Sequence, residues 1–389
     1  MSGQSGQRKT PGLAPRTGNT TLLAIPQASS GLLAKYCNKS FFEESQKESQ
    51  VLLVVVYSTV CAVGLPANCL TAWLTLLQAL QGNVLAVYLF CLALCELLYL
   101  STLPLWVIYI QNQHRWTLGL QACKVTAYVF FCNIYISVLF LCCVSCDRFM
   151  AVVYALESRG HRHQKTAVFI SASVFILVGL VHYPVFEMEQ QQGTCFEALP
   201  TDGRIARYHY LRFAAGFAIP LSIIAFTNHR IIRSIRLSVG LNATQKAKVK
   251  YSVAAIVLIF LVCFAPYHLV LLIKAIAFSY YGGDTDTLCA FEASLYKVST
   301  VFLCLSTANS VADPIIYVLA TDHSRQEVSR IHKEWKVWVT KTDLSKLMYS
   351  KDLEEAKSPP VLVCCCEYSR SVHPPGPPRS LERLSEESC

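Results

Sequence analysis

The tripeptide Asp147-Arg148-Phe149 follows directly on the apolar run IYISVLFLCCVSC. A charged side chain beside membrane hydrocarbon is costly, so an arginine in this position marks a functional site by default. A lone arginine could instead extend its charged end to the lipid head groups. The adjacent Asp147 favours the functional interpretation, because its carboxylate can satisfy the guanidinium until backbone carbonyls of another helix replace it.

An isolated cation, Arg212, lies in a second apolar stretch, before Pro220. The separation corresponds to about 12 Å of helix. The planar fork of an arginine suits a carboxylate or phosphate group; the alternatives are that it reaches the head groups or pairs with an acid of the same chain. The side chains that could line an apolar channel beside it are Tyr128, Phe131, Tyr135, Tyr267, His268 and Phe278.

These residues belong to a chain of 389 residues that is 53% hydrophobic and 15% charged. Soluble domains contain about 25% charged residues, so the composition indicates a membrane protein. The length of its apolar stretches and their lack of alternation favour transmembrane helices, which need about 20 residues each, over barrel strands. We therefore predict an all-α seven-transmembrane helix bundle at residues 51–319. The predicted spans are residues 51–77, 84–110, 122–154, 166–186, 208–232, 249–278 and 291–319.

The distribution of basic residues in the short connections predicts the orientation of the chain. Six bases and no acid surround the connection between spans five and six, and further bases follow spans three and seven. The connection between spans six and seven contains Asp284 and Asp286 and no base. We therefore expect a multi-pass plasma-membrane protein with its N-terminus outside the cell. Its net charge of +9 mostly reflects this asymmetry and does not indicate a nucleic-acid surface.

Histidine is the side chain that titrates closest to neutral pH. Of the 10 histidines, three lie toward the outer side of the predicted spans and one in their upper core. Each is a candidate proton sensor, although a surface histidine usually titrates without functional consequence. These candidates are His114, His182, His209 and His268.

The two ends of the chain differ in composition from the spans. Residues 1–50 are polar and contain glycosylation sequons at Asn19 and Asn38, which fits an extracellular segment. Residues 320–338 combine bases with apolar residues at helical spacing, which predicts an amphipathic helix on the inner leaflet, with a plain surface helix as the alternative. Residues 339–389 are rich in proline and serine, so we expect a disordered cytoplasmic tail whose phosphorylation recruits arrestin.

Seven motifs in order resemble those of rhodopsin-like G-protein-coupled receptors across residues 50–338. They are GLPANCL, LALCELL, WTLG before Cys123, Asp147-Arg148-Phe149, Pro220, CFAPYH and NSVADPIIY. Stretches such as PANCLTAWL and VCFAPYHLVLL are similar to the subfamily of proton-sensing and lysolipid receptors. The resemblance implies coupling to heterotrimeric G proteins and a lipid ligand such as an oxidised fatty acid or a lysolipid, with protons as a further stimulus.

The resemblance also implies two groups of functional residues inside the bundle. The group for G-protein coupling and activation is Asp147, Arg148, Phe149, Asn228, Phe264, Pro266, Asp313, Pro314 and Tyr317. The group for an internal sodium pocket is Glu96, Ser137, Asn309, Ser310 and Asp313. Two carboxylates that approach each other in a low dielectric resist double ionisation, so they should share a proton or a cation. A purely structural hydrogen-bond network is the alternative for this pocket, and no cofactor other than this sodium ion is expected.

The sequence departs from the usual pattern of the family at several of these positions. Glu96 stands in place of an aspartate, Asn228 in place of a tyrosine, Phe264 in place of a tryptophan and Phe149 in place of a tyrosine.

Only four of the 18 cysteines fall on the oxidising outer side, where four cysteines allow three pairings. We predict the disulfides Cys123–Cys195 and Cys37–Cys289.

Other classes of protein fit the sequence less well. A receptor of the same fold for a different small or peptide ligand remains an alternative. A transporter is disfavoured because the spans show no evident internal repeat. An enzyme is not expected, because no HExxH or GxSxG motif is present and no metal site is evident.

Overall fold

The computed structural model describes residues 39–155, 157, 162–187, 195, 201–238, 240, 242–282, 284–320, 330 and 333; of residues 39–48 and Ala320 it places only the backbone. Seven helical spans in this part are long and apolar enough to cross a membrane, so the predicted fold class is confirmed. Their elements are α2 (Lys39–Leu80), α3 (Val84–Gln111), α4 (Leu120–Val153), α5 (Gln164–His182), η2 (Tyr183–Phe186), α6 (Gly203–Phe213), η3 (Ala214–Ala218), α7 (Ile219–Leu237), α8 (Ala243–Ile259), η4 (Phe260–Phe264), α9 (Ala265–Tyr281), α10 (Thr285–Thr307) and α11 (Asn309–Ala320).

The chain divides into two compact units, Met1–Val328 and Ser329–Cys389. All seven spans lie in the first unit. Of the second unit, Arg330 and Lys333 are described, and both are helical. The predicted amphipathic helix, the cytoplasmic tail and the sequons at Asn19 and Asn38 therefore lie largely or wholly outside the described residues.

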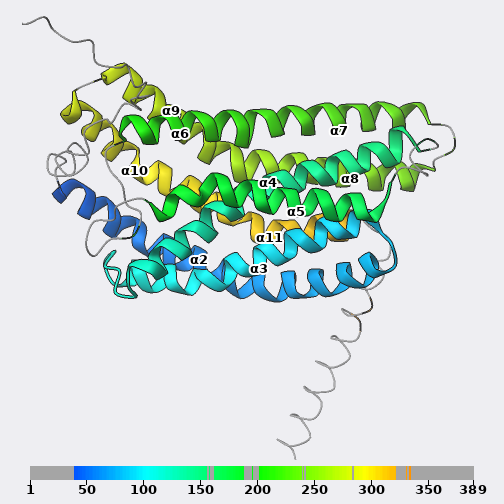
Figure 1. Ribbon diagram of the computed structural model, residues 1–389, viewed down its shortest axis with the longest axis horizontal. Coiled ribbons are helices and arrows are strands. Elements are labelled where there is room, and N and C mark those ends of the chain that lie inside the picture. Colours follow the sequence, from blue (N-terminus) through cyan, green and yellow to red (C-terminus); the bar gives the residue numbers. More distant parts are fainter. Residues whose placement is uncertain are drawn as a thin grey trace, which may run out of the picture. The chain divides into compact units, whose positions relative to one another are not determined.

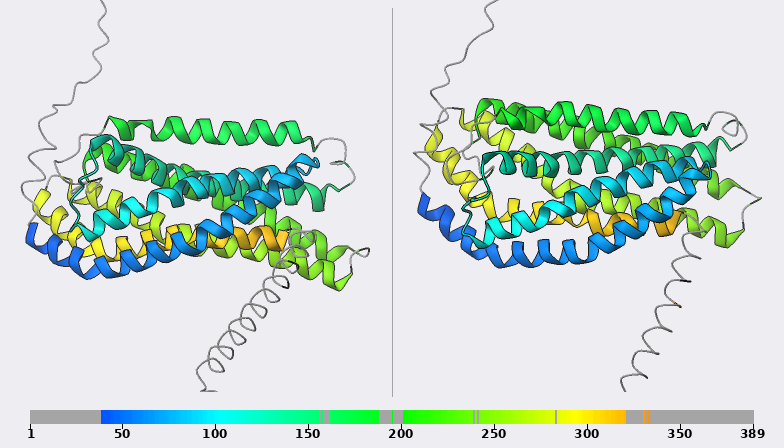
Figure 2. Two further views of the ribbon diagram at one scale, coloured as in Figure 1. Left: turned by 90° about the horizontal axis from the view of Figure 1, so that it is seen from below. Right: turned by 60° about the horizontal axis from the view of Figure 1, so that its bottom comes forward.

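The spans run side by side along the long axis of the bundle (Figures 1 and 2). The third span, α4, packs against α3, α5 and α7, and its residues Val138, Phe140 and Leu141 are completely buried. Large apolar side chains on the outer spans are exposed instead, as a surface that faces lipid requires; Phe169 of α5, for example, is 72% exposed.

Spans five, six and seven begin several residues before their predicted starts, because polar caps extend the helices beyond the apolar stretches. The side chains of Asp202, Asn242 and Asp284 accept hydrogen bonds from the first-turn amides of α6, α8 and α10. Such N-caps satisfy backbone donors that have no partner within the helix. A search for apolar residues alone does not detect these first turns.

The prolines of spans five and six follow short π-helical segments. Pro220 lies in the first turn of α7, after η3, and Pro266 lies in the first turn of α9, after η4. A proline inside a helix removes a backbone donor and crowds the preceding turn. A π-helical turn accommodates this disruption and is frequent at functional sites, so both spans carry an irregular turn just before their proline.

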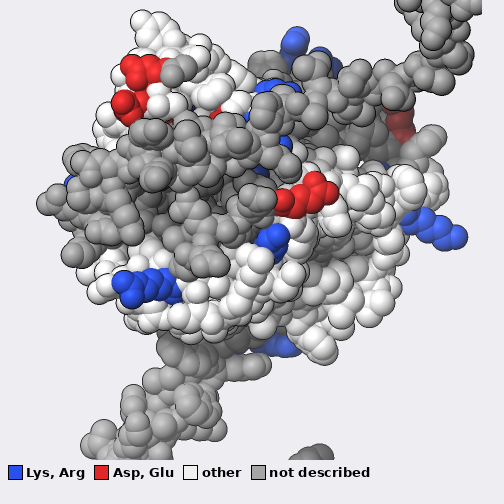
Figure 3. Space-filling model, turned by 60° about the vertical axis from the view of Figure 1, so that its left-hand side comes forward, with Lys and Arg blue, Asp and Glu red and all other residues white. Residues whose placement is uncertain are grey.

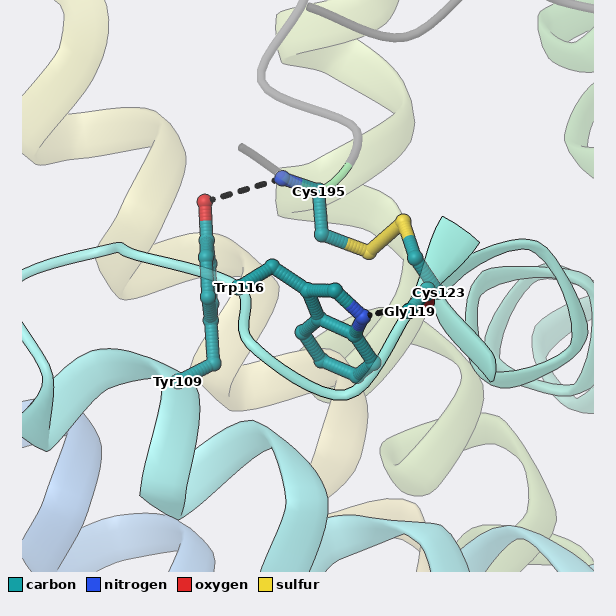
Figure 4. The surroundings of a disulfide bond; sticks show 5 residues. All are labelled: Tyr109, Trp116, Gly119, Cys123 and Cys195. Atoms are coloured by element: carbon teal, nitrogen blue, oxygen red, sulfur yellow. Dashed lines mark hydrogen bonds between the residues drawn. A yellow bond between two sulfur atoms is a disulfide. The ribbon is translucent and has the colours of Figure 1, made fainter. Parts of the chain in front are cut away.

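At the outer end of the bundle, a disulfide joins Cys123 of α4 to Cys195, with 5.7 Å between the Cα atoms. Figure 4 shows that the Cys195 amide donates to the Tyr109 hydroxyl (3.2 Å), and that the Trp116 indole donates to the Gly119 carbonyl (2.8 Å). Gly119 has φ +86°, a conformation that glycine adopts readily. The predicted Cys123–Cys195 disulfide is thus confirmed.

The second predicted disulfide is only partly within the described chain. Cys289, near the start of α10, is disulfide-bonded. Cys37 lies outside the described residues, so its pairing with Cys289 stays a prediction.

Candidate functional site

The first constellation surrounds Glu96, which is fully buried on α3. One of its carboxylate oxygens accepts from Ser137 of α4 (2.6 Å) and from Asn309 of α11 (3.0 Å). The other accepts from Asn133 (3.3 Å) and from Ser310. A buried carboxylate needs such partners, because desolvation without them is very costly. The structure therefore unites the predicted pocket and adds Asn133, which lies one helical turn before Ser137 and could have been found from that spacing.

Asp313 of α11 is the second carboxylate of this pocket. Its side chain is buried and interacts electrostatically with Glu96. The Asn309 and Glu96 side chains lie near its carboxylate oxygens, but within the described part of the chain neither oxygen accepts a hydrogen bond of regular geometry. Hard monovalent and divalent cations prefer oxygen ligands, so Glu96, Ser137 and Asp313 offer a donor set that fits a sodium ion. Such an ion would supply the positive charge that the two buried carboxylates lack.

At the inner end of span three, Asp147 has a partner that the sequence did not indicate. Its carboxylate accepts from the Arg162 guanidinium, with Nη2 at 2.7 Å from both oxygens and Nε at 3.1 Å from one. Arg162 lies just before α5 and its side chain is 32% exposed, whereas that of Asp147 is 6% exposed. The carboxylate that we expected to satisfy Arg148 is therefore bound by Arg162. Nothing in the sequence pointed to Arg162, because the pair is joined only by tertiary folding.

The other predicted coupling residues link neighbouring spans near this inner end. Asn228 of α7 accepts from Ser145 of α4 (3.0 Å). Tyr317 of α11 accepts from Gln78 of α2 (2.9 Å). Phe149 packs against the small apolar cluster of Ile231, Ile235 and Val253, which joins spans three, five and six.

The second constellation surrounds Arg212, on α6 in the outer half of span five. Its guanidinium carbon lies 4.7 Å from the centroid of the Phe131 ring of α4, a cation–π geometry. Among the residues that the structure describes, no acidic side chain forms an ion pair with Arg212. For that part of the chain, the alternative of an internal counter-ion is therefore excluded.

A group of buried rings lies beside Arg212. The ring of Tyr135 lies 4.8 Å from that of His182 and 5.6 Å from that of His268, between centroids. His268 also stacks on Phe217 at 5.4 Å. These four residues come from α4, α5, α9 and η3, so four spans meet at this point.

The hydrogen bonds of these histidines determine which ring nitrogen carries the proton. His182 Nδ1 lies 2.9 Å from the Val178 carbonyl oxygen, and His268 Nδ1 lies 2.8 Å from the Phe264 carbonyl oxygen. A carbonyl only accepts, so each Nδ1 donates, and in the neutral ring Nε2 is left as an acceptor.

Four residues near Arg212, namely Tyr135, His182, His209 and His268, each have a buried polar atom without a hydrogen-bond partner in the described chain. Buried polar atoms are normally paired, so unpaired ones require an explanation such as a ligand or water. Each of the four residues also interacts electrostatically with Arg212. The atoms are the Tyr135 hydroxyl, His182 Nε2, His209 Nδ1 and His268 Nε2.

The remaining predicted lining and sensor residues have other environments. Tyr128 donates to the Gly179 carbonyl of α5 (3.0 Å), which links spans three and four. Tyr267 is buried and contacts the His268 ring. Phe278 of α9 lies next to Gly203, at the start of α6. His114 packs on Tyr109 at the outer end and has no ring contact with Tyr135, His182 or His268 among the described residues.

A seven-span bundle with these constellations defines the class of the protein. The profile of the family described as "7 transmembrane receptor (rhodopsin family)" matches residues 67–317. The chain belongs to this family. It is thus a G-protein-coupled receptor of the plasma membrane and a signalling protein, not an enzyme.

Its relatives place it in one group of these receptors. It is 69% identical to the human "Probable G-protein coupled receptor 132" over 374 residues, which are 96% of this chain and 97% of the relative. It is 65% identical to the Mus musculus protein of the same description, over 96% of this chain and 98% of the relative. The "G-protein coupled receptor 68" of Mus musculus is 34% identical over 72% of this chain and 77% of the relative.

Proposed function

We propose that this receptor binds an anionic lipid, such as an oxidised fatty acid or a lysolipid, through Arg212, and that protons act as a second stimulus. One observation supports this most strongly: the Arg212 guanidinium has no acidic partner among the described residues and borders a group of unpaired buried polar atoms. Arg212 is half-buried. An arginine without a counter-ion in the outer half of a membrane span favours an incoming carboxylate or phosphate.

The ring contacts suggest how binding at Arg212 would reach the inner half of the bundle. His268 stacks on Phe217 of η3, Phe217 stacks on Phe260 of η4 at 5.5 Å, and Phe260 contacts Phe264 at 5.9 Å. These rings join the two π-helical segments, which precede the prolines of spans five and six. A ligand that moves the His268 ring would therefore shift the conformation of η3 and η4. These two segments are the least regular turns of the bundle and are best suited to adopt two alternative arrangements.

At the inner face, Arg148 would contact the G protein once span six moves away. The Glu96–Asp313 pocket would follow the same change, since a cation or proton held there stabilises one arrangement of spans two, three and seven more than another. The outer position of the N-terminus and arrestin binding by the tail belong to this proposal. They are supported by the distribution of bases and by the serines beyond residue 341.

Ligand-stimulated nucleotide exchange on purified G proteins tests the proposal, with a panel of anionic lipids measured across a pH series. Arg212→Ala should weaken lipid potency by roughly 10- to 150-fold, as expected for a lost charge-assisted hydrogen bond of ~1.5–3 kcal/mol. Arg212→Lys should restore only part of it, because an ammonium cannot bind in a bidentate manner.

Arg207→Ala is the matched control, because Arg207 is an exposed arginine on the same helix that contacts the backbone of Gly203. It should leave lipid potency at the wild-type level. If both Arg212 variants shift the pH response and leave lipid potency unchanged, the assignment of Arg212 to the lipid head group is wrong.

A further inference from the structure

Glu292 of α10 is a buried carboxylate that has no part in the two constellations described above. It is 1% exposed, and both of its oxygens lie within hydrogen-bond distance of the Thr201 backbone amide, at 3.1 and 3.2 Å. Thr201 is itself 4% exposed. A charge this deeply buried needs hydrogen bonds or an opposite charge, and Lys274 of the adjacent α9 supplies an electrostatic interaction.

The amide that Glu292 binds lies immediately before α6. Asp202, the next residue, is the N-cap of that helix, and its side chain accepts from the Arg204 and Ile205 amides. The N-terminus of a helix carries a partial positive charge, which favours a carboxylate close to it. Glu292 therefore fastens the start of α6 to the start of span seven by a hydrogen bond and by charge.

The helix fastened in this way carries the residues of the candidate lipid site. His209 and Arg212 are three positions apart, so they project from the same side of α6. Arg212 lies about 14 Å along the helix axis from its first residue. Beyond Phe213 the backbone passes into the π-helical segment η3, an irregular joint. α6 is thus a short helix that is held at its outer end and continues into the less regular η3 at its inner end.

A second contact holds α6 nearer its inner end, where the Tyr210 hydroxyl lies 3.0 Å from the Ser279 hydroxyl of α9. This bond is exposed, so water competes with it. The buried Glu292–Thr201 bond is shielded from that competition and is the stronger constraint. Figure 3 shows this outer end obliquely, with acidic and basic side chains of the described residues on its surface.

We propose that Glu292 is a positioning residue for lipid recognition: it sets the orientation of α6 and so places Arg212 over Phe131. This inference rests on the proposed lipid-binding function of Arg212. In this proposal Glu292, on span seven, orients the outer helix of span five and contacts neither the lipid head group nor the G protein.

The test uses the full-length receptor in nanodiscs and begins with a measurement that needs no ligand. Glu292→Ala should accelerate hydrogen–deuterium exchange of the amides of residues 201–213. Glu292→Gln keeps an oxygen that can accept from the Thr201 amide but loses the charge, so its exchange rate should lie between those of wild type and Glu292→Ala. Asp286→Asn is the control, because Asp286 is an exposed carboxylate in the first turn of the same helix, and it should have no effect.

The second measurement is the potency of oxidised oleate in nucleotide exchange. Glu292→Ala should lower it by about 10-fold, since a displaced Arg212 retains only part of its charge-assisted bond. Combined with Arg212→Ala, it should cause no further loss, because both changes act on one interaction.

The outcomes separate this inference from the proposed function. Unchanged exchange at residues 201–213 in Glu292→Ala would overturn the positioning role, as would equal acceleration in Glu292→Gln or additive losses in the double variant. If exchange accelerates but Arg212→Ala leaves the potency of oxidised oleate unaltered, Glu292 still anchors α6 and the lipid assignment of Arg212 is the part that fails.

Discussion

Gly216 lies where the Tyr135 ring meets span five, and its replacement by alanine should destabilise the receptor. An ideal Cβ at Gly216 would lie 2.2 Å from Cε1 and 2.7 Å from Cδ1 of Tyr135. Carbon atoms in favourable contact are about 3.5–4.0 Å apart, so the ring has to move. It has little room, because Tyr135 is only 5% exposed and the rings of His182 and His268 flank it. Such overpacking typically costs about 1–3 kcal/mol.

Thermal unfolding of the purified receptor in nanodiscs measures this effect, and Gly216→Ala should lower the midpoint. Gly203→Ala is the matched control in the same span. A Cβ at Gly203 would lie 3.5 Å from the Phe278 ring, which is ordinary van der Waals contact. Alanine is also the better helix former by up to ~1 kcal/mol, so this variant should unfold at or slightly above the wild-type midpoint.

A double-mutant cycle with Tyr135→Ala decides whether the clash is the cause. Without the ring, Gly216→Ala should be harmless, which gives a coupling of about 1–3 kcal/mol between the two positions. A wild-type midpoint for Gly216→Ala, or equal losses with and without the Tyr135 ring, would refute the packing described for this site.

Three further predictions concern the inner face and the tail. Arg148→Ala should abolish nucleotide exchange on G proteins while surface expression and lipid binding persist; normal exchange would remove the proposed role of Arg148. Arg162→Ala and Asp147→Asn should each destabilise the receptor, and their cycle should show a coupling of roughly 1–3 kcal/mol, reduced by the partial exposure of Arg162; purely additive midpoints would show that the ion pair contributes nothing. Truncation after Lys341 should prolong signalling and slow internalisation, since the phosphorylation sites are removed; unchanged signal decay in cells would contradict the arrestin proposal.

Much of the fold followed from local sequence because the bilayer imposes local rules. A spanning segment must satisfy its own backbone groups, so an apolar stretch of sufficient length predicts a helix without knowledge of its neighbours. The seven spans were predicted in this way, and the Cys123–Cys195 disulfide was predicted from the cysteines on the outer side. The starts of α6, α8 and α10 were predicted too late, because their first turns depend on polar caps.

The pairing of side chains within the bundle could not be predicted from the sequence. The sequence indicated that Glu96, Asp147 and Arg212 were significant, because charges in apolar stretches are rare. It did not indicate that Arg162, 15 residues away, binds Asp147, or that Glu292 binds the amide of Thr201, 91 residues away. Such partners share no helical face and no periodic pattern, so no local rule relates them.

The sequence by itself therefore determined the spans, since these depend on solvation and short-range geometry, and its motifs determined the class of the protein. It also indicated the candidate site residues. Only the tertiary structure decided which of those residues meet. Packing of four spans brought Tyr135, His182, Phe217 and His268 together, and a missing Cβ at Gly216 made room for the ring at their centre. Contacts of this kind depend on shape complementarity between distant segments, which composition and spacing do not encode.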